Sequence, residues 1–465
     1  MTTIVVLSLI SFVLLIGCGK KTVVTENSIS YSGGVYPENG LPKDKKVTIQ
    51  AIFPVAGYGK EYFEFAVKTF QERFPNVTID VHLIEEGNVI YQSRMKSLLQ
   101  SGNEKEMYDW IYSLGEDDSK YLIESGKLER QDELWERFLY DLPQKKVEDV
   151  HLLEERPVTI DGHIYAIPTQ STIYGLYYNK KMFKENGWKE QSKNWEEFLL
   201  ICEKIKARGI SPLVMAGKYP YYFSYGWGAI PHEVGGEEYF NAQYKYAPNL
   251  YVSKPYLTML ERMEAFVKKG YLHPGTASFD HTQSQMEFIQ GKAALITNAT
   301  WIANEMREVT SSDFEWGFMP FPGNNPGQKQ VILVTSTSQG YIWKNKPELQ
   351  KKWAKEFNLW LLNLDVQLKF AKSGGVPVRK DLTQNEKRIA NVSPSVIAAL
   401  QSINSEDVRL INDGMREKQI KNVEMAKLAK VKQDGYIALI TGRKDASKVA
   451  KEINEQYMKG LSLEK

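Results

Sequence analysis

Cysteine is scarce in this chain of 465 residues, which contains only Cys18 and Cys202. No CxxC pair is present, so the redox and zinc sites built on that motif are excluded. Cys202 lies within the helical pattern NWEEFLLICEKIKARG, and we expect it to be a buried thiol that packs as a small hydrophobic residue. Cys18 stands in a different setting, which is treated below.

The chain also lacks an excess of charge of either sign. Its 59 basic and 57 acidic residues give a formal net charge of +2. Nucleic-acid-binding proteins usually carry a strongly basic face, so nucleic acid is not a favoured partner.

Motifs for catalysis, metals and cofactors are missing as well. There is no GxSxG, Walker or HExxH motif, and the six histidines show no recognised ligand spacing. The run Gly57-Tyr58-Gly59 lacks the third glycine of a dinucleotide fingerprint. A glycosidase needs a positioned pair of carboxylates, and no stretch of this sequence points to one. We therefore predict no catalytic residue, no metal and no cofactor.

Only one long apolar run occurs, from Ile4 to Gly17. It is too short for a membrane-spanning helix of about 20 residues but fits the apolar part of a signal peptide. Residues 15–18 read LIGC and resemble the bacterial lipobox, in which the cysteine is lipidated and becomes the first residue. The segment departs from the usual lipoprotein signal in two ways. Residues 1–3 contain no Lys or Arg, and position 16 is Ile where Ala or Ser is usual.

From this pattern we predict a lipoprotein signal peptide at 1–17 and a lipid, such as palmitate, on Cys18. Residues 18–45 are rich in Ser, Gly, Pro, Asn and Lys, so we predict a flexible tether there. The alternatives are a plain secretory signal or a short anchor. The lipoprotein interpretation predicts an extracytoplasmic protein held on the cell membrane.

Aromatic residues are abundant, with 26 Tyr, 19 Phe and 10 Trp. Tyr and Trp combine a flat apolar face with a polar edge, which suits ligand clefts and interfaces. Many of them could equally be core residues.

The folded part begins with alternating strands and helices. The runs VTIQAIF (47–53), VTIDVHLI (77–84) and YDWIYS (108–113) are β-rich, and helical patterns separate them. This βαβαβ start predicts a mainly parallel sheet with helices on both faces. A second series begins near residue 163, where we expect two short strands split by a polar loop. A length of 465 residues suits two lobes.

The resemblance to a known family rests on five segments in that family's order. They read YAIPTQSTIYGLYYNKKMF, NWEEFLLICEKIKARGISPL, FIQGKAALITNATW, WGFMPFP, and KKWAKEFNLWLLN followed by SGGVPVRKD. The chain resembles the extracellular solute-binding proteins of ABC importers, in the sugar-binding group of maltose-binding-protein type. The block from Gly270 to Met306 is similar to the N-acetylglucosamine and chitobiose-binding branch.

The resemblance implies an α/β, periplasmic-binding-protein-like fold with two lobes, central mainly parallel sheets and a hinge. Lobe one would comprise 46–166 and 318–347, and lobe two 170–317 and 351–465. The chain would cross between the lobes near Tyr165 to Pro168, near Met319 and near Lys346. A ligand would lie in the cleft and favour the closed state.

Aromatic side chains are expected to cover the apolar faces of a sugar ring. The family places a stacking aromatic at Trp301, although this residue could instead pack beneath the following helix. We expect an aromatic-rich loop at 219–227 in which Tyr222 or Trp227 lines the cleft. Tyr58 lies in the glycine-flanked loop after the first strand.

Polar groups would bind the hydroxyl rim of the sugar. The family sets a ligand-facing polar residue near Gln170 and Thr172. Ser113 and Glu116 follow the third strand, where open α/β sheets bind ligands, although Glu116 could simply belong to a solvated acidic run. Gly374 and Gly375 form a loop that approaches the sugar in the family, with a helix C-cap as the alternative for one of them.

The sequence thus predicts a lipid-anchored, monomeric receptor that binds a sugar and delivers it to the permease of an ABC importer. Two alternatives remain open: a secreted carbohydrate-active hydrolase, and a receptor for a solute other than a sugar. The ligand itself is not specified by the sequence.

Overall fold

The computed structural model describes residues 33–464, except 56, 86–87, 153–158, 160, 384, 404, 415, 418–419 and 421. The predicted signal peptide, Cys18 and the first part of the expected tether therefore lie outside the described residues. Residues 33–45 belong to a separate unit, Met1–Lys45, and form a turn in which Val35 and Pro42 are bridged. Everything below concerns the second unit, Lys46–Lys465.

One sheet has four strands in the order β2-β1-β3-β9. Their bounds are β1 (Val47–Pro54), β2 (Val77–Ile84), β3 (Trp110–Ile111) and β9 (Tyr341–Ile342). Strand β1 runs parallel to β2 and β3, and β9 is antiparallel to β3. The predicted βαβαβ start is confirmed, because its β-branched strands pair in parallel with helices between them.

Helices cover both faces of this sheet. Those packed around it are α1 (Glu61–Arg73), α2 (Asn88–Ser101), α3 (Glu116–Glu124), α12 (Glu348–Trp360) and α13 (Leu364–Lys372). Phe53 of β1 stacks on Phe63 of α1 at 4.1 Å between centroids, and Phe357 of α12 meets Phe63 edge-on at 5.7 Å. We call this sheet with its helices lobe one; short η1 (Glu104–Glu106), η2 (Asp132–Glu136) and α4 (Val147–Val150) complete it.

The second sheet has six strands in the order β10-β8-β4-β6-β5, with β7 also paired to β4. Their bounds are β4 (Ile167–Asn179), β5 (Ser211–Val214), β6 (Ala293–Ala299), β7 (Trp316–Met319), β8 (Gln330–Gln339) and β10 (Val408–Ile411). Pairs β5–β6 and β8–β10 are parallel, whereas β4 is antiparallel to its neighbours, so this sheet is mixed and not mainly parallel as expected. We call this sheet with its helices lobe two.

The remaining helices belong mostly to lobe two. Their bounds are α5 (Lys180–Glu185), α6 (Trp195–Lys206), α7 (Pro220–Trp227), α8 (Ala229–Tyr244), α9 (Lys254–Lys268), α10 (His281–Ile289), α11 (Ile302–Glu305), α14 (Lys380–Thr383), α15 (Glu386–Ile389), α16 (Pro394–Ile403), α17 (Val423–Ile440) and α18 (Ala446–Ser462), with η3 (Leu250–Val252) and η4 (Thr276–Ser278). Asn194 caps the start of helix α6, because its side chain accepts a hydrogen bond from the Glu197 N–H. Cys202 lies on the buried face of this helix, as expected.

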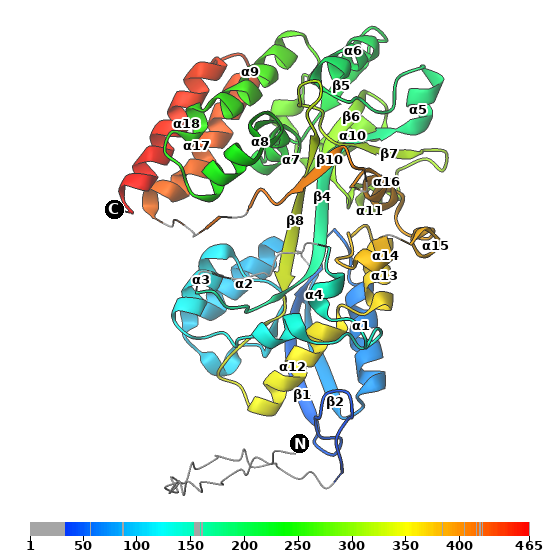
Figure 1. The fold of residues 1–465 in the computed structure, drawn as a ribbon, viewed down its shortest axis with the longest axis vertical. Helices are drawn as coiled ribbons and strands as arrows, with labels where there is room; N and C mark the ends of the chain where they lie inside the picture. Colours follow the sequence, from blue (N-terminus) through cyan, green and yellow to red (C-terminus); the bar gives the residue numbers. More distant parts are fainter. Residues whose placement is uncertain are drawn as a thin grey trace, which may run out of the picture. The chain divides into compact units, whose positions relative to one another are not determined.

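Strand β4 is continuous, whereas the sequence suggested two short strands split by a polar loop. It spans 13 residues and pairs with β8 from Ile167↔Gln339 to Tyr174↔Leu333, with a register shift between Pro168 and Gln170. The polar residues near its start form backbone ladder bonds, so they stay in the strand. Figure 1 shows β4 and β8 running together between the elements of the two lobes.

The expected lobe boundaries need correction at two places. Strand β7 pairs with β4 through Met319↔Leu176, and β8 begins beside β10, so residues from 318 to the middle of β8 lie in the sheet of lobe two. Helices α12 and α13, expected in lobe two, instead pack on β1 and α1 in lobe one. The return crossing is therefore strand β8, and neither the segment near Met319 nor the segment near Lys346, which joins β9 to α12 within lobe one, is a crossing.

A buried polar junction joins α12 to the chain where it enters lobe one from β8. The Trp110 Nε1–H donates to Asn358 Oδ1 at 2.6 Å, and Asn358 Nδ2 donates to Gln131 Oε1 and to the Gly340 carbonyl, both at 2.7 Å. Gly340 has φ +77°, and a Cβ there would lie within 1.8 Å of Asn358 Oδ1. Only glycine fits this approach.

We predict that Asn358→Ala lowers the free energy of unfolding by roughly 2–4 kcal/mol, because buried partners such as the Trp110 N–H lose their hydrogen bonds. Urea unfolding followed by tryptophan fluorescence measures this change. The matched control is Asn345→Ala, at an exposed position, with an expected change within about 0.5 kcal/mol. Equal effects of the two substitutions would contradict the role given to the junction.

Candidate ligand-binding site

Tyr58, in the loop after β1, reaches from lobe one to lobe two. Its hydroxyl is 3.0 Å from Thr172 Oγ1 on β4, and its ring lies 6.2 Å from the Trp301 ring in an edge-to-face arrangement. A second link runs beside it, where Asn304 Nδ2 donates to the Gly57 carbonyl at 2.6 Å. The Gly57–Tyr58 loop therefore connects the lobes at the point where β4 passes between them.

Four aromatic side chains gather here and are called the ring cluster: Tyr58, Tyr174, Tyr225 and Trp301. Tyr174 stacks on Tyr225 with 4.1 Å between centroids, and Trp301 meets these two rings edge-on at 6.1 and 6.0 Å. The cluster draws on β4, α7, the end of β6 and the loop of lobe one. It offers several ring planes and hydroxyls within one site, which is the combination that a sugar ring requires.

Local backbone geometry fixes Trp301 between β6 and α11. Its carbonyl accepts hydrogen bonds from the Asn304 and Glu305 N–H groups, which starts the helix directly after it. Gly374, just after the end of α13, has φ +93°, and a Cβ at this position would lie 3.4 Å from Trp301 Cα. Gly374 thus follows the end of the helix and its backbone lies against that of Trp301, while its approach to a sugar stays a prediction.

Burial controls the chemistry of the cluster. It raises the pKa of Tyr58, Tyr174 and Tyr225 above the ordinary value, so these hydroxyls stay protonated and can donate hydrogen bonds. Tyr174 is also hydrogen-bonded to Thr335 Oγ1 at 2.9 Å. Beside the cluster, burial raises the pKa of Glu305, which accepts a hydrogen bond from Gln285 at 2.7 Å.

Three predicted residues lie on the lobe-one side. Gln170 is buried, with Nε2 donating to the Tyr62 hydroxyl at 2.5 Å and Oε1 accepting from the Tyr112 hydroxyl at 3.0 Å. The Ser113 carbonyl accepts a hydrogen bond from the Tyr91 hydroxyl at 2.7 Å. Glu116 is the first residue of α3, and its side chain lies outside the described part of the structure.

The aromatic stretch 219–227 is a helix, α7, and not a loop. Tyr222 is 4% exposed and lies 5.1 Å from Tyr225, so it adjoins the ring cluster. Trp227 is 1% exposed and packs among the core rings of lobe two, 4.7 Å from Phe321. Tyr222 and Trp227 are five positions apart on the helix, so their side chains point to different faces of it.

The structure brings only some of the predicted residues together. The group at the ring cluster consists of Tyr58, Thr172, Trp301 and Gly374, with Tyr222 next to them. Gly375 lies behind the Phe370 ring, which a Cβ on Gly375 would meet at 2.0 Å and whose centre is 4.9 Å from that of Tyr58.

Sequence reasoning missed Tyr174, Tyr225 and Asn304. Tyr174 follows Thr172 by two residues, and the two-residue period of a strand could have placed both on one face. Tyr225 was part of the aromatic stretch but could not be singled out without knowing the helix face. Asn304 carries no signal of its own, since its role depends on the Gly57 carbonyl of the other lobe.

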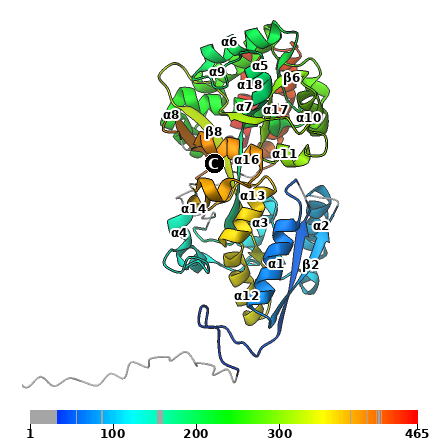
Figure 2. The same cartoon turned by 90° about the vertical axis from the view of Figure 1, so that its right-hand side faces the viewer.

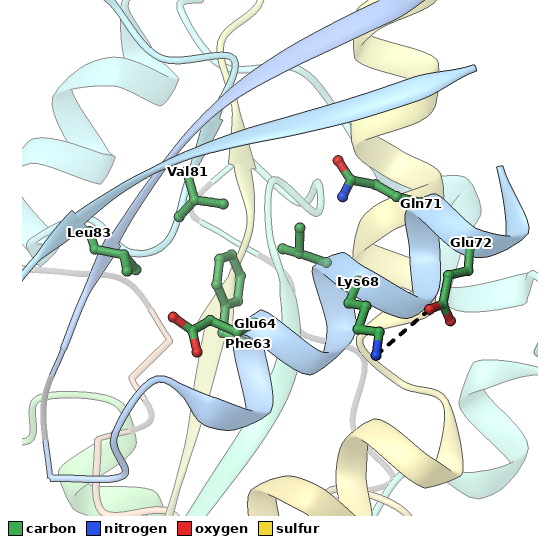
Figure 3. A pocket seen from close by; sticks show the side chains of 8 residues that line it. Phe63, Glu64, Lys68, Gln71, Glu72, Val81 and Leu83 are labelled. Atoms are coloured by element: carbon green, nitrogen blue, oxygen red, sulfur yellow. Dashed lines mark ion pairs between the residues drawn. The ribbon is translucent and has the colours of Figure 1, made fainter. Parts of the chain in front are cut away.

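A groove of about 460 Å³ lies elsewhere, between α1 and β2. Figure 3 shows its apolar residues, Phe63, Val81 and Leu83, and the ion pair of Lys68 with Glu72 along its rim. It brings together no aromatic planes with hydroxyls. It therefore lacks the features that mark the ring cluster.

Within the part of the chain that the structure describes, no group of three or more His, Cys, Asp or Glu residues could hold a metal ion. None of the helices in that part combines the length and the apolar character that a membrane span requires.

The sequence profile of one family, described as bacterial extracellular solute-binding protein, matches residues 56–367. This match covers more than half of the chain, so the chain belongs to that family. The resemblance predicted from the five sequence segments is confirmed.

Two sequence relatives illustrate the similarity. The diacetylchitobiose-binding protein NgcE of Streptomyces coelicolor is 26% identical over 275 residues, which cover 59% of this chain and only 56% of the relative. An uncharacterized ABC transporter extracellular-binding protein of Pyrococcus horikoshii is 22% identical over 459 residues, or 96% of both chains.

Solved structures show the same fold. A chitin oligosaccharide-binding protein superposes with a TM-score of 0.69 at 19% identity, covering 89% of this chain and 99% of that chain. RafE in complex with raffinose gives 0.65 at 17% identity, with 89% and 99% coverage. The two-lobed α/β fold class predicted from the sequence is therefore confirmed.

We predict that Tyr58→Phe weakens the contact between the lobes. Loss of the hydrogen bond to Thr172 costs about 1 kcal/mol, which corresponds to a roughly fivefold change in the equilibrium between opened and closed contact. Amide hydrogen exchange in α11 should then be about fivefold faster. The control is Tyr121→Phe, at a tyrosine that is 64% exposed. Unchanged exchange in Tyr58→Phe would contradict this role.

Proposed function

We propose that this protein is the sugar-binding receptor of an ABC importer, with oligosaccharides of amino sugars such as chitobiose as its favoured ligand class. The observation that carries the proposal is the ring cluster, which joins aromatic planes and protonated hydroxyls at the contact between the lobes. Family membership and the names of the diacetylchitobiose- and chitin oligosaccharide-binding relatives support it. No bond is made or broken in this function.

The proposed mechanism is capture followed by closure. Sugar rings bind against Trp301 and the tyrosines, and the hydroxyls of Tyr58 and Thr172 bind the sugar's hydroxyl rim. Tyr58 belongs to lobe one and Trp301 to lobe two, so a ligand that touches both stabilises the closed arrangement. The closed receptor then delivers its ligand to the permease.

Two other functions make different demands. A hydrolase would need a pair of carboxylates about 5–9 Å apart across the sugar. Near the ring cluster Glu305 is one such group, and its Oε2 accepts a hydrogen bond from the Gln285 side-chain amide. A receptor for a solute other than a sugar would bind regardless of competing sugars.

We also propose that the receptor is a monomer held outside the cell by a lipid on Cys18. The sequence pattern LIGC and the extracellular character of the family support this location. As the receptor of an importer, the protein would have the carbohydrate ligand and the permease subunits as its partners.

We predict that Trp301→Ala weakens oligosaccharide binding roughly 10- to 100-fold, because the sugar loses one of its stacking faces. Calorimetric titration should use N-acetylglucosamine, chitobiose, maltose, cellobiose and xylobiose. A ligand present at about 100 times its Kd should also stabilise the folded protein by about 2.7 kcal/mol.

Tyr121→Ala, which removes an exposed aromatic residue that is not part of the cluster, is the control and should bind as the wild type does. Chromatography of the sugars after incubation tests for cleavage. Release of shorter sugars would favour the hydrolase, and the absence of binding to every sugar would favour a different solute.

We predict that Cys18→Ser abolishes lipid attachment, since the hydroxyl cannot replace the thiol that carries the lipid. Growth of the bacterium with a clickable palmitate analogue, followed by fractionation, measures this. The wild type should be labelled and membrane-bound, and the variant unlabelled and released into the soluble fraction. The control is Cys202→Ser, which should remain labelled. Equal labelling of Cys18→Ser and wild type would refute the anchor.

A further inference from the structure

A groove of about 240 Å³ adjoins the ring cluster and is called the basic groove. Its lining residues come from both lobes and are Gly59, Glu61, Asn304, Arg307, Lys369, Lys372 and Ser373. Gly59 follows Tyr58 directly, Asn304 lies one helical turn after Trp301, and Ser373 precedes Gly374. The groove therefore lies next to the proposed sugar site, and Figure 2 shows α11 and α13 close to each other.

The groove carries an excess of positive charge. Three cationic side chains, Arg307, Lys369 and Lys372, face one carboxylate, Glu61. Among the described residues no carboxylate forms an ion pair with Lys369 or Lys372, whereas Arg307 is paired at 3.1 Å with the exposed Glu308. Lys369 lies 6.0 Å from the centre of the Phe65 ring.

Helix electrostatics explain only part of this arrangement. Lys369 and Lys372 occupy the last turn of α13, where the helix dipole favours cations. Arg307, however, comes from the segment after α11 in lobe two and lines the same groove. The convergence of cations from two lobes therefore needs a further explanation.

One carboxylate lies next to the ring cluster, because a Cβ on Gly57 would be 2.9 Å from Glu305 Oε1. Glu305 is not among the residues that line the basic groove, whereas Lys369 and Lys372 are. An anionic group on a ligand would therefore be favoured at the groove and disfavoured beside Glu305, because like charges repel.

We propose that the basic groove binds an anionic substituent of the sugar ligand: a carboxylate, sulfate or phosphate that projects past Trp301 and Gly374. This inference rests on the proposed sugar-receptor function and adds a preference for acidic sugars. Lysine ammonium groups suit all three anions as point charges, so the shared chemistry is a single negative group next to a pyranose.

The test compares matched neutral and acidic sugars by calorimetric titration at low and at physiological ionic strength. The pairs are chitobiose with its 6-O-sulfate, and cellobiose with the corresponding uronic acid; the two pairs distinguish sulfate from carboxylate. The wild type should bind at least one acidic member about tenfold more tightly than its neutral parent, and salt should reduce this preference.

The double substitution Lys369→Gln/Lys372→Gln should reduce the preference to about threefold or less. The matched control is Lys448→Gln/Lys451→Gln on α18, which removes the same charge at exposed positions and should keep the full preference. Thermal unfolding midpoints confirm that both variants are folded.

Three results overturn the proposal. Equal binding of neutral and acidic sugars by the wild type removes the anion preference and leaves the sugar receptor intact. A preference that survives in Lys369→Gln/Lys372→Gln assigns the anion to another place. Failure of every sugar to bind overturns the proposed function and this inference together.

Discussion

The site depends on one pair of strands, β4 and β8, which run antiparallel between the lobes. Gln170, Thr172 and Tyr174 are two residues apart on β4 and share one face of it. Along that face Gln170 contacts the tyrosines of lobe one, Thr172 contacts Tyr58, and Tyr174 stacks in the ring cluster. A single strand therefore sets the spacing of the lobe contact and of the site.

The first lobe could be predicted in large part because its signals are local. The runs 47–53 and 77–84 are β-branched and apolar, and they became β1 and β2 with helix α1 between them. Strand β4 could not be recognised in full, because Gln170, Ser171 and Thr172 have the composition of a loop. Ladder bonds to β8, more than 160 residues away in sequence, keep them extended.

The predicted lobe boundaries were wrong for the same reason, namely that they depend on contacts between segments far apart in the sequence. Nothing within the sequence of β7 shows that it pairs with β4, or within α12 that it covers β1. Helix α7 was mistaken for a loop because it contains Pro220 and Gly226; the proline is tolerated there because it occupies the first turn. Such outcomes depend on tertiary contacts that override local preference.

The candidate site was predictable where a residue has a local reason for its place. Trp301 follows a strand and precedes a helix, and Gly374 ends a helix with a positive φ. Tyr174, Tyr225 and Asn304 depend on which face of an element meets the other lobe. The choice between Tyr222 and Trp227 likewise depended on the helical turn of α7.

The buried tyrosines have a consequence for where such a protein can work. Outside the cell, acidity is set by the surroundings and not by the organism. A site that relied on histidine would gain and lose charge as those surroundings changed. The hydroxyls of Tyr58, Tyr174 and Tyr225 have raised pKa values, so acid or mildly alkaline media leave them neutral and able to donate. These donors keep one protonation state across the habitats that a bacterium meets.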